Sequence, residues 1–208
     1  MSKAKFITFE GIECAGKSTQ VKFLADYLLQ KNIQIHCTRE PGGTVLGDQL
    51  RQLLASHAYQ VDAVSELLMM FASRSAHVSE VIRPMLQSGT WVLCDRFVDA
   101  SYAYQGAGRQ VSQQTIASLE LLTCQDIKPD ITFLLDLPIS KMLERMQERS
   151  TGPDRIELES QAFFEQVRAA YLQRASDEPD RFIVLDAGLE VVQVSQTIIE
   201  HLQERCDV

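Results

Sequence analysis

The sequence predicts an α/β fold of three layers, in which helices cover both faces of a parallel sheet. Short apolar runs alternate along the chain with longer segments of helical periodicity. This alternation is typical of strands that are buried on both faces between crossover helices. In addition, a glycine-rich loop, residues 11–18, joins the first apolar run to the first helical segment. Functional side chains are then expected at the carboxyl ends of the strands.

Each apolar run is expected to form one strand, which gives a five-stranded sheet. The expected strands are 6–9, 33–37, 91–94, 131–137 and 182–185. The expected helices are 18–30, 45–57, 64–86, 112–123, 139–148, 162–174 and 191–203. Pro84 should kink the third of these helices near its end, and Ser88-Gly89 should stop it. Residues 102–108 are expected to form a glycine-containing connection.

Composition favours one domain over residues 1–208 with an ordinary globular core. The chain has 208 residues, 45% of them hydrophobic, and a net charge of −8. The acidic balance gives no support to nucleic-acid binding, which needs Lys and Arg to neutralise phosphates. No signal peptide or membrane span is indicated, and an odd number of cysteines without a C-x-x-C pair suggests neither disulfides nor a zinc site. A cytoplasmic location is therefore expected.

The glycine-rich loop reads G-x-x-x-x-G-K-S, the pattern of a P-loop nucleoside triphosphatase or kinase. Its backbone N–H groups can converge on phosphates at a helix N-terminus, Lys17 can reach the β- and γ-phosphates, and the Ser18 hydroxyl can bind Mg²⁺. An ordinary turn with a solvated lysine is the alternative, which the flanking strand and helix disfavour. The absence of an N-K-x-D motif favours a small kinase over a GTPase. The expected ATP-binding residues are Gly11, Ile12, Glu13, Cys14, Ala15, Gly16, Lys17, Ser18 and Thr19.

Aspartates stand at the ends of three expected strands. Asp95 is the candidate partner of Ser18 at the metal, because a P-loop usually works with an aspartate from a neighbouring strand. Arg96 follows directly and places an anion site beside the metal site, although a surface salt bridge could also explain the pair. Asp136 is explained as well by helix capping, and Asp186 by a turn.

Several further segments, in order along about three-quarters of the chain, resemble the thymidylate kinase family. They are Phe9-Glu-Gly11, Thr38-Arg-Glu-Pro-Gly-Gly43, Leu68-Met-Met-Phe71 with Arg74, Asp95-Arg-Phe97, Ser101-Tyr-Ala-Tyr-Gln-Gly106 and Asp154-Arg-Ile-Glu157. The resemblance implies a sheet of the nucleoside-monophosphate kinase type, usually in a homodimer. It also implies phosphorylation of dTMP to dTDP with ATP and Mg²⁺, a step in dTTP biosynthesis.

The resemblance also implies roles for single residues. Glu13 would lie near the sugar and acceptor phosphate, Arg96 would hold that phosphate, and Tyr104 would crowd the sugar 2′ position. Phe71 would stack on thymine, although its apolar surroundings also suit a core residue, and Arg74 would donate to a base carbonyl. The full set implied to bind dTMP is Arg39, Glu40, Pro41, Phe71, Arg74, Arg96, Ser101, Tyr104 and Gln105.

The loop carries Cys14 where some family members have an arginine, so the resemblance implies that a lid near 145–157 supplies the catalytic arginine. Arg155 is the first candidate and Arg149 the second, while an ion pair with Glu148 explains Arg145. The implied catalytic residues are Lys17, Arg96, Arg155, Arg149 and Glu13.

No histidine is assigned to the chemistry, because a phosphate acceptor is already largely dianionic near neutral pH and needs no general base. A deoxynucleoside kinase is the nearest alternative, and its hydroxyl acceptor would need Glu40 or Glu13 as a base. A kinase for another pyrimidine monophosphate and a non-catalytic nucleotide-binding module are further alternatives.

Overall fold

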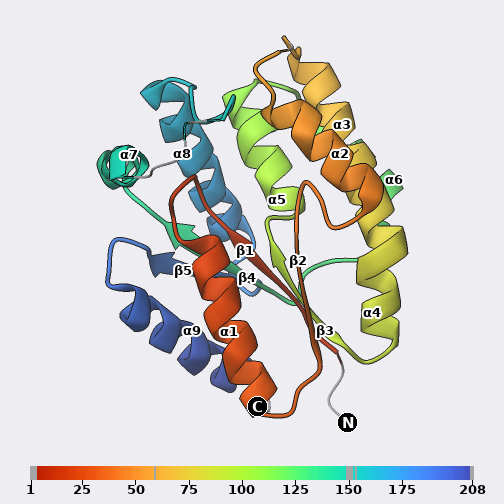
Figure 1. The fold of residues 1–208 in the computed structure, drawn as a ribbon, viewed down its shortest axis with the longest axis vertical. Helices are drawn as coiled ribbons and strands as arrows, with labels where there is room; N and C mark the ends of the chain where they lie inside the picture. Colours follow the sequence, from red (N-terminus) through yellow and green to blue (C-terminus); the bar gives the residue numbers. More distant parts are fainter. Residues whose placement is uncertain (1–3, 59, 149–151, 153, 207–208) are drawn as a thin grey trace.

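A parallel sheet of five strands forms the centre of the protein (Figure 1). The computed structural model describes residues 4–206 except 59, 149–151 and 153. The strands are β1 (Phe6–Glu10), β2 (Ile35–Arg39), β3 (Trp91–Asp95), β4 (Ile131–Asp136) and β5 (Phe182–Asp186). Their order in the sheet is β2-β3-β1-β4-β5, and every pairing is parallel. The predicted fold class is confirmed.

Strand β1 lies in the middle of the sheet, paired with β3 on one side and β4 on the other. All five of its residues are buried, as the apolar run predicts for a strand covered on both faces. The chain leaves β1 towards the β2 edge and later crosses to β4 on the opposite side, so the order reverses at β1. A ligand crevice is expected outside the carboxyl ends of strands at such a point.

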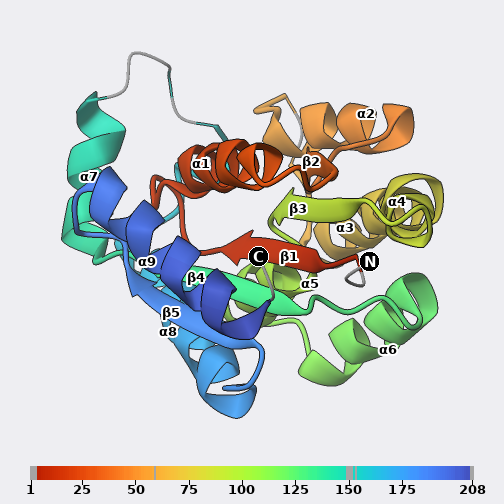
Figure 2. The same cartoon turned by 90° about the horizontal axis from the view of Figure 1, so that it is seen from below.

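Helices cover both faces of the sheet. Figure 2 shows α1 and α9 on one face, and α3, α5 and α8 on the other. The described helices are α1 (Lys17–Gln30), α2 (Val45–Ala55), α3 (Ala63–His77), the π-helix Val78–Ile82, α4 (Arg83–Gln87), α5 (Val98–Ser101), the π-helix Tyr102–Gly108, α6 (Gln113–Cys124), α7 (Ile139–Glu148), α8 (Gln161–Asp177) and α9 (Val191–Arg205).

Side-chain oxygens fix where several helices begin. Thr44 accepts from the Gly47 N–H at α2, and Asp62 accepts from two N–H groups at α3. Ser112 and Ser160 do the same for α6 and α8. Each cap satisfies an N–H group that has no partner inside its helix. The sequence therefore sets these starts locally.

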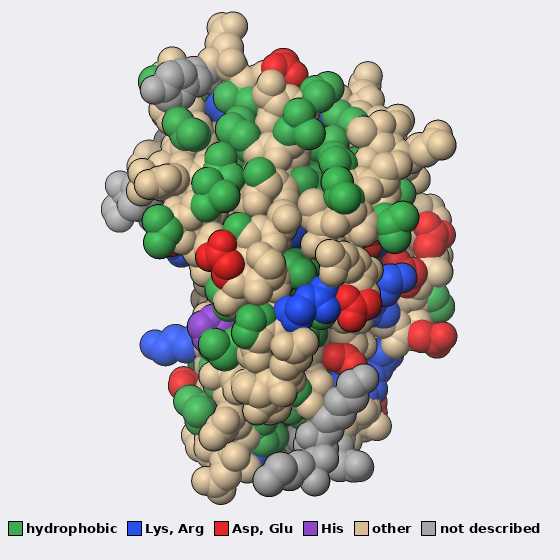
Figure 3. Space-filling model, turned by 90° about the vertical axis from the view of Figure 1, so that its right-hand side faces the viewer, with side chains coloured by type: hydrophobic (Ala, Val, Ile, Leu, Met, Phe, Trp, Pro, Cys, Tyr) green, Lys and Arg blue, Asp and Glu red, His purple; other side chains and the backbone are tan. Residues whose placement is uncertain are grey.

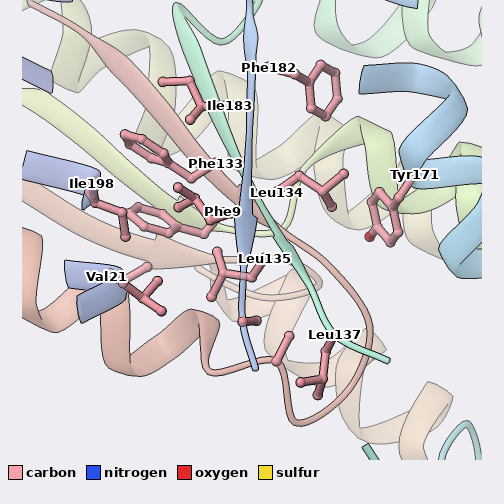
Figure 4. Close-up of a cluster of buried hydrophobic side chains, with 14 of the residues drawn as sticks. Phe9, Val21, Phe133, Leu134, Leu135, Leu137, Tyr171, Phe182, Ile183 and Ile198 are labelled. Atoms are coloured by element: carbon pink, nitrogen blue, oxygen red, sulfur yellow. The ribbon is translucent and has the colours of Figure 1, made fainter. Parts of the chain in front are cut away.

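The largest hydrophobic core lies between the sheet and the helices on both of its faces (Figure 4). Phe9 and Phe133, from the neighbouring strands β1 and β4, contact each other with ring centroids 5.4 Å apart. Val21 of α1 and Ile198 of α9 pack on one side of the sheet, and Tyr171 of α8 packs on the other. This core packs around β1, the strand that leads into the glycine-rich loop.

Two predicted elements differ from the structure. The helix expected over 64–86 is interrupted by a π-helical turn at Val78–Ile82, before Pro84, so the proline begins α4 instead of kinking one continuous helix. Residues 102–108, expected as a connection, continue α5 as a π-helix. The wider π turn lets its buried side chains point to several neighbouring elements. The apolar periodicity of the sequence alone does not indicate such a turn.

None of the five cysteines, all of them described, forms a disulfide. Within the described part of the chain, no helix is long and apolar enough to cross a membrane.

Candidate active site

The glycine-rich loop leaves β1 and ends where α1 begins. Gly11 and Gly16 have φ angles of 138° and 90°, and a side chain on Gly11 would approach the Leu135 carbonyl oxygen to 2.5 Å. The Lys17 ammonium lies inside the loop, 3.1 Å from the Gly11 carbonyl oxygen and 2.8 Å from that of Ile12. Burial, with help from the Arg96 charge, lowers the pKa of Lys17 to about 8. The loop is thus formed around its own cation.

Two oxygen ligands lie together at the start of α1. The Ser18 hydroxyl donates to Asp95 Oδ2, which stands at the carboxyl end of β3. Among the described residues, no group of three or more His, Cys, Asp or Glu side chains is arranged as a metal cage. One hydroxyl and one carboxylate beside a phosphate loop suit Mg²⁺, which keeps several waters and binds through few protein ligands together with phosphates.

Arg96 leaves β3 in the left-handed region, with φ of 70°, which turns its side chain towards the loop. Its Nη2 donates to Glu13 Oε1 at 2.9 Å, and its guanidinium lies over the Tyr104 ring, 4.8 Å from the centroid. The Tyr104 hydroxyl donates to Glu13 Oε2 at 2.6 Å. Glu13 therefore joins the glycine-rich loop to both side chains.

A buried ion network lies next to the loop that follows β2. Glu40 accepts from Arg74 Nε at 2.7 Å and pairs with His77 Nδ1 at 2.9 Å, and all three side chains are fully buried. The other ring nitrogen of His77 is 2.7 Å from the Thr38 hydroxyl. Arg74 also donates to Ser101 Oγ at 3.0 Å. Because every charge has a partner, the network can fix the loop at Glu40 without leaving an isolated buried ion.

A cavity of about 540 Å³ joins these parts. Residues of the glycine-rich loop line it together with Arg39, Pro41, Asp95, Arg96 and Tyr104. Five further lining residues, which were not predicted as site residues or, for Arg145, were explained otherwise, are Arg51, Glu66, Met70, Arg145 and Glu157. Glu66 and Arg145 have partners 89 and 131 residues away in the sequence, so no local pattern marks these two.

Only some of the residues predicted to contact the base line the cavity. Gln105 lines the cavity, whereas Phe71, Arg74 and Ser101 do not. The Phe71 ring is 2% exposed and belongs to the second core cluster, with the Arg74 guanidinium 4.7 Å from its centroid. Contact of Phe71 or Arg74 with a base therefore stays a prediction and would need this stack to open.

The predicted lid, near residues 145–157, begins in the last turn of α7 and precedes α8, and Arg149 falls outside the described residues. Arg155 lines the cavity, donating to the Leu54 carbonyl oxygen at 2.9 Å and to Glu66 Oε2 at 2.7 Å. Arg145 donates to the carbonyl oxygens of Cys14 and Ala187, at 3.0 and 2.9 Å. The ion pair with Glu148 expected for Arg145 is thus replaced by a link to the glycine-rich loop.

Asp136 and Asp186, the remaining strand-end aspartates, have structural roles. Asp136 makes a bidentate pair with Arg168 of α8, at 2.6 and 2.8 Å. Asp186 accepts from the Gly188 N–H, which confirms the expected turn. Neither residue is among those that line the cavity.

The fold and the cavity define a P-loop kinase of the nucleoside-monophosphate kinase class. A phosphate loop at the centre of a parallel sheet faces a second set of arginines across one cavity. The chain belongs to the thymidylate kinase family, whose family model matches residues 9–198.

Proteins similar over their full lengths bear the same family name. The thymidylate kinase of Chromohalobacter salexigens is 46% identical over 207 residues, covering 99% of this chain and 98% of its own length. That of Vesicomyosocius okutanii is 48% identical over 204 residues, covering 98% and 99%. The crystal structure of thymidylate kinase from Ehrlichia chaffeensis superposes with a TM-score of 0.79 at 35% identity, over 97% of this chain and 99% of that one.

Proposed function

We propose that this chain transfers the γ-phosphoryl group of ATP to dTMP, forming dTDP for dTTP synthesis. One observation carries the proposal: a single cavity joins the glycine-rich loop, with Lys17, to Arg96 and Arg39. A cavity with two anion-binding parts suits a donor and an acceptor that both carry phosphates. The names of the relatives support dTMP as the acceptor.

The donor half holds the triphosphate. The backbone N–H groups of the loop and the start of α1 bind the phosphates, and Lys17 moves from its carbonyl partners to the β- and γ-phosphates. Ser18 and Asp95 would hold Mg²⁺, which supplies positive charge to the transferring group. The pair fits this ion because both ligands are hard oxygens.

The acceptor half holds the monophosphate in line with the donor. Arg96 binds its phosphate, and Arg39, at the end of β2, lines the same region. Tyr104 packs beside the sugar and Glu13 orients Arg96 from the loop side. Positioning and neutralised charge then supply most of the rate enhancement, because a phosphate acceptor needs no base. Arg155, and Arg149 beyond the described residues, are proposed to add charge as the lid closes.

The surroundings of Glu40 and Glu13 favour this function over a deoxynucleoside kinase. A hydroxyl acceptor would need one of these carboxylates as a base. Glu40 is 2% exposed and held by Arg74 and His77, and Glu13 is held by Arg96 and Tyr104. Because these partners already occupy both carboxylates, neither group is free to lie against the hydroxyl of an acceptor and take its proton.

The side-chain amide of Gln105 is placed to distinguish one pyrimidine base from another. Its Nε2 donates to Glu66 Oε1 at 2.8 Å, and because a carboxylate only accepts, this contact fixes the orientation of the amide. Its Oε1 has no hydrogen-bond partner among the described residues. We propose that this oxygen accepts from N3–H of thymine. Cytosine has no hydrogen at N3, so dCMP should be a poorer acceptor than dTMP or dUMP.

A panel of acceptors tests the proposed function. ADP release is measured with ATP, Mg²⁺ and, in turn, dTMP, dUMP, dCMP and thymidine. The expected order of kcat/KM places dTMP first, dUMP second and dCMP well below both, with no turnover of thymidine. Turnover of thymidine alone would establish the deoxynucleoside kinase, and nucleotide binding without any turnover would establish a non-catalytic module.

We further propose a homodimer, working in the cytoplasm, that forms through an apolar surface on α3 and α6. This surface consists of Val64, Leu68, Leu121 and Leu122, which are 57%, 52%, 74% and 71% exposed. Figure 3 shows hydrophobic side chains gathered over this side of the molecule. Helices α3 and α6 pack against each other, so the four side chains form one patch of the kind that marks an interface.

Light scattering tests the dimer. The expected mass is twice the chain mass of 23.4 kDa, and Leu121→Glu should shift it towards the monomer because it places a charge in the interface. Val192→Glu, at an equally exposed position on α9, is the control and should stay dimeric. A monomeric wild type, or an equal shift in both variants, would reject this surface as the interface.

A further inference from the structure

The carboxylate of Glu66 is a buried meeting point of three segments. Glu66 lies in the first turn of α3, and its side chain is 1% exposed. It accepts from Gln105 Nε2 at 2.8 Å and from Arg155 Nη2 at 2.7 Å, and it pairs with Arg109 Nη2 at 3.4 Å. One carboxylate therefore faces two arginines, and one of them belongs to the lid.

Arg155 is held at two points. Besides Glu66, it donates through Nε to the carbonyl oxygen of Leu54, near the end of α2. The turn that carries it is closed internally, because Asp154 Oδ1 accepts from the N–H groups of Ile156 and Glu157. A turn closed in this way moves as a unit, so the contacts of Arg155 decide where the turn rests against α2 and α3.

Arg109 keeps Glu66 paired if Arg155 leaves. Its Nη1 is 2.7 Å from Glu159, and its guanidinium lies over the Phe163 ring, 4.9 Å from the centroid. These contacts hold Arg109 in place independently of Arg155. Removing the partner of a buried carboxylate is costly, but here a second cation remains on the same group. Arg155 can therefore be released without leaving Glu66 as an isolated buried charge.

We infer that Glu66 is a positioning residue that holds Arg155, and with it the lid turn, in the substrate-free enzyme. The phosphates of the bound substrates then take Arg155 from it. Two phosphates carry more negative charge than one carboxylate that is already shared with Arg109, so they compete well for the guanidinium. This inference rests on the proposed function for the substrates, whereas the resting contact itself is a property of the protein alone.

Trypsin cleavage of the ligand-free protein after Arg155 measures the resting contact, because cleavage follows the population of the open lid. Mass spectrometry identifies the cleaved bond. Glu66→Gln removes the charge that holds Arg155 and is expected to speed cleavage at this bond by at least about fivefold. Glu80→Gln makes the same chemical change at an exposed position and should cleave like the wild type. Equal rates in Glu66→Gln and wild type would overturn the inference.

A second variant tests the same contact from the lid side. Arg155→Lys keeps a trypsin site but loses the planar group that reaches both Glu66 and the Leu54 carbonyl. It should also cleave faster at this bond, and it leaves α3 intact if Glu66→Gln proves poorly folded. Slow cleavage of a folded Arg155→Lys protein would count against the contact. Neither measurement needs enzymatic activity, so a failure of the proposed function would not be mistaken for a failure of this inference.

Kinetics with ATP and dTMP test whether Glu66 holds Arg155 at rest or in its working position. If the contact belongs to the resting state, the loss of kcat in Glu66→Gln should be at least about tenfold smaller than the loss in Arg155→Gln. The reason is that Arg155 stays free to reach the phosphates in Glu66→Gln. If both variants lose kcat equally, Glu66 is required while the phosphates are bound, and the release step is wrong.

Discussion

The two halves of the cavity hold their cations in different ways. In the donor half, Lys17 and Arg145 rest on backbone carbonyl oxygens. In the acceptor half and under the lid, Arg96 and Arg155 rest on carboxylates. A carbonyl leaves the full positive charge for an incoming phosphate, whereas a carboxylate neutralises it until the contact changes. Before substrates bind, the cations of the donor half therefore keep their charge. In the acceptor half, carboxylates neutralise the cations and chiefly fix the direction in which their side chains point.

The largest expected effect comes from removing the cation of the donor half. Lys17→Ala should lower kcat by on the order of a thousandfold, because it removes charge from the transferring group in a site shielded from water. ADP release with saturating dTMP measures it. Lys22→Ala, an exposed position on the same helix, is the control and should behave as wild type. Comparable losses in both variants would mean that α1, and not the loop cation, is affected.

Arg96→Ala tests the acceptor half. We expect kcat/KM for dTMP to fall by on the order of a hundredfold, with KM for ATP changing by less than about threefold, because Arg96 is proposed to bind the acceptor phosphate and not ATP. Initial rates with each substrate varied in turn separate these values. Unchanged constants for dTMP would remove Arg96 from the acceptor site.

A smaller effect is expected for Tyr104→Ala, which removes the ring proposed to crowd the sugar. Preference for dTMP over its ribose analogue should fall about tenfold, as for other shape-based choices. Tyr104→Phe keeps the ring and loses only the hydroxyl bond to Glu13, so it should retain the preference. If the phenylalanine variant loses it as well, the hydroxyl and not the ring makes the choice.

The last expected effect is on stability and not on activity, and it concerns Glu10, at the end of β1. It accepts from the Phe97 N–H and the Tyr171 hydroxyl, and burial, with the Asp99 charge, raises its pKa from 4.5 to about 8. The folded state then binds a proton that the unfolded state releases. Stability from this group is complete below about pH 4.5 and lost as pH rises through about 8, at up to about 1.4 kcal/mol per pH unit.

Glu10→Gln should remove this contribution to the pH dependence. Urea unfolding of wild type and variant between pH 5 and 8 compares the two slopes of unfolding free energy against pH. Parallel slopes would show that Glu10 is ionised in the folded protein.

Local patterns predicted most of the fold. Ser112 and Ser160 mark helix starts within a few residues, and the strand that ends at Glu10 was expected to within one residue. The π turn at Val78–Ile82 could not be predicted, because no proline or glycine lies within it. The turn follows buried His77, which contacts Glu40, so its position depends on tertiary packing.

The candidate site was predictable where its residues follow strands. The glycine-rich loop and Asp95-Arg96 lie at the carboxyl ends of β1 and β3, and the structure brings them to one cavity. Glu66 could not be found in this way, because its partner Arg155 is 89 residues away in the sequence. On its own, Glu66 looks like an ordinary acidic residue in the first turn of a helix.

Glu13 belongs to the phosphate loop but holds two side chains of the opposite half, Arg96 and Tyr104. Any shift of the loop on binding ATP therefore changes the geometry that meets dTMP. Linkage makes this effect reciprocal: the factor by which one substrate alters the affinity for the other must be the same in both directions. Under the proposed function, Glu13 therefore couples the two binding equilibria through its contacts with Arg96 and Tyr104.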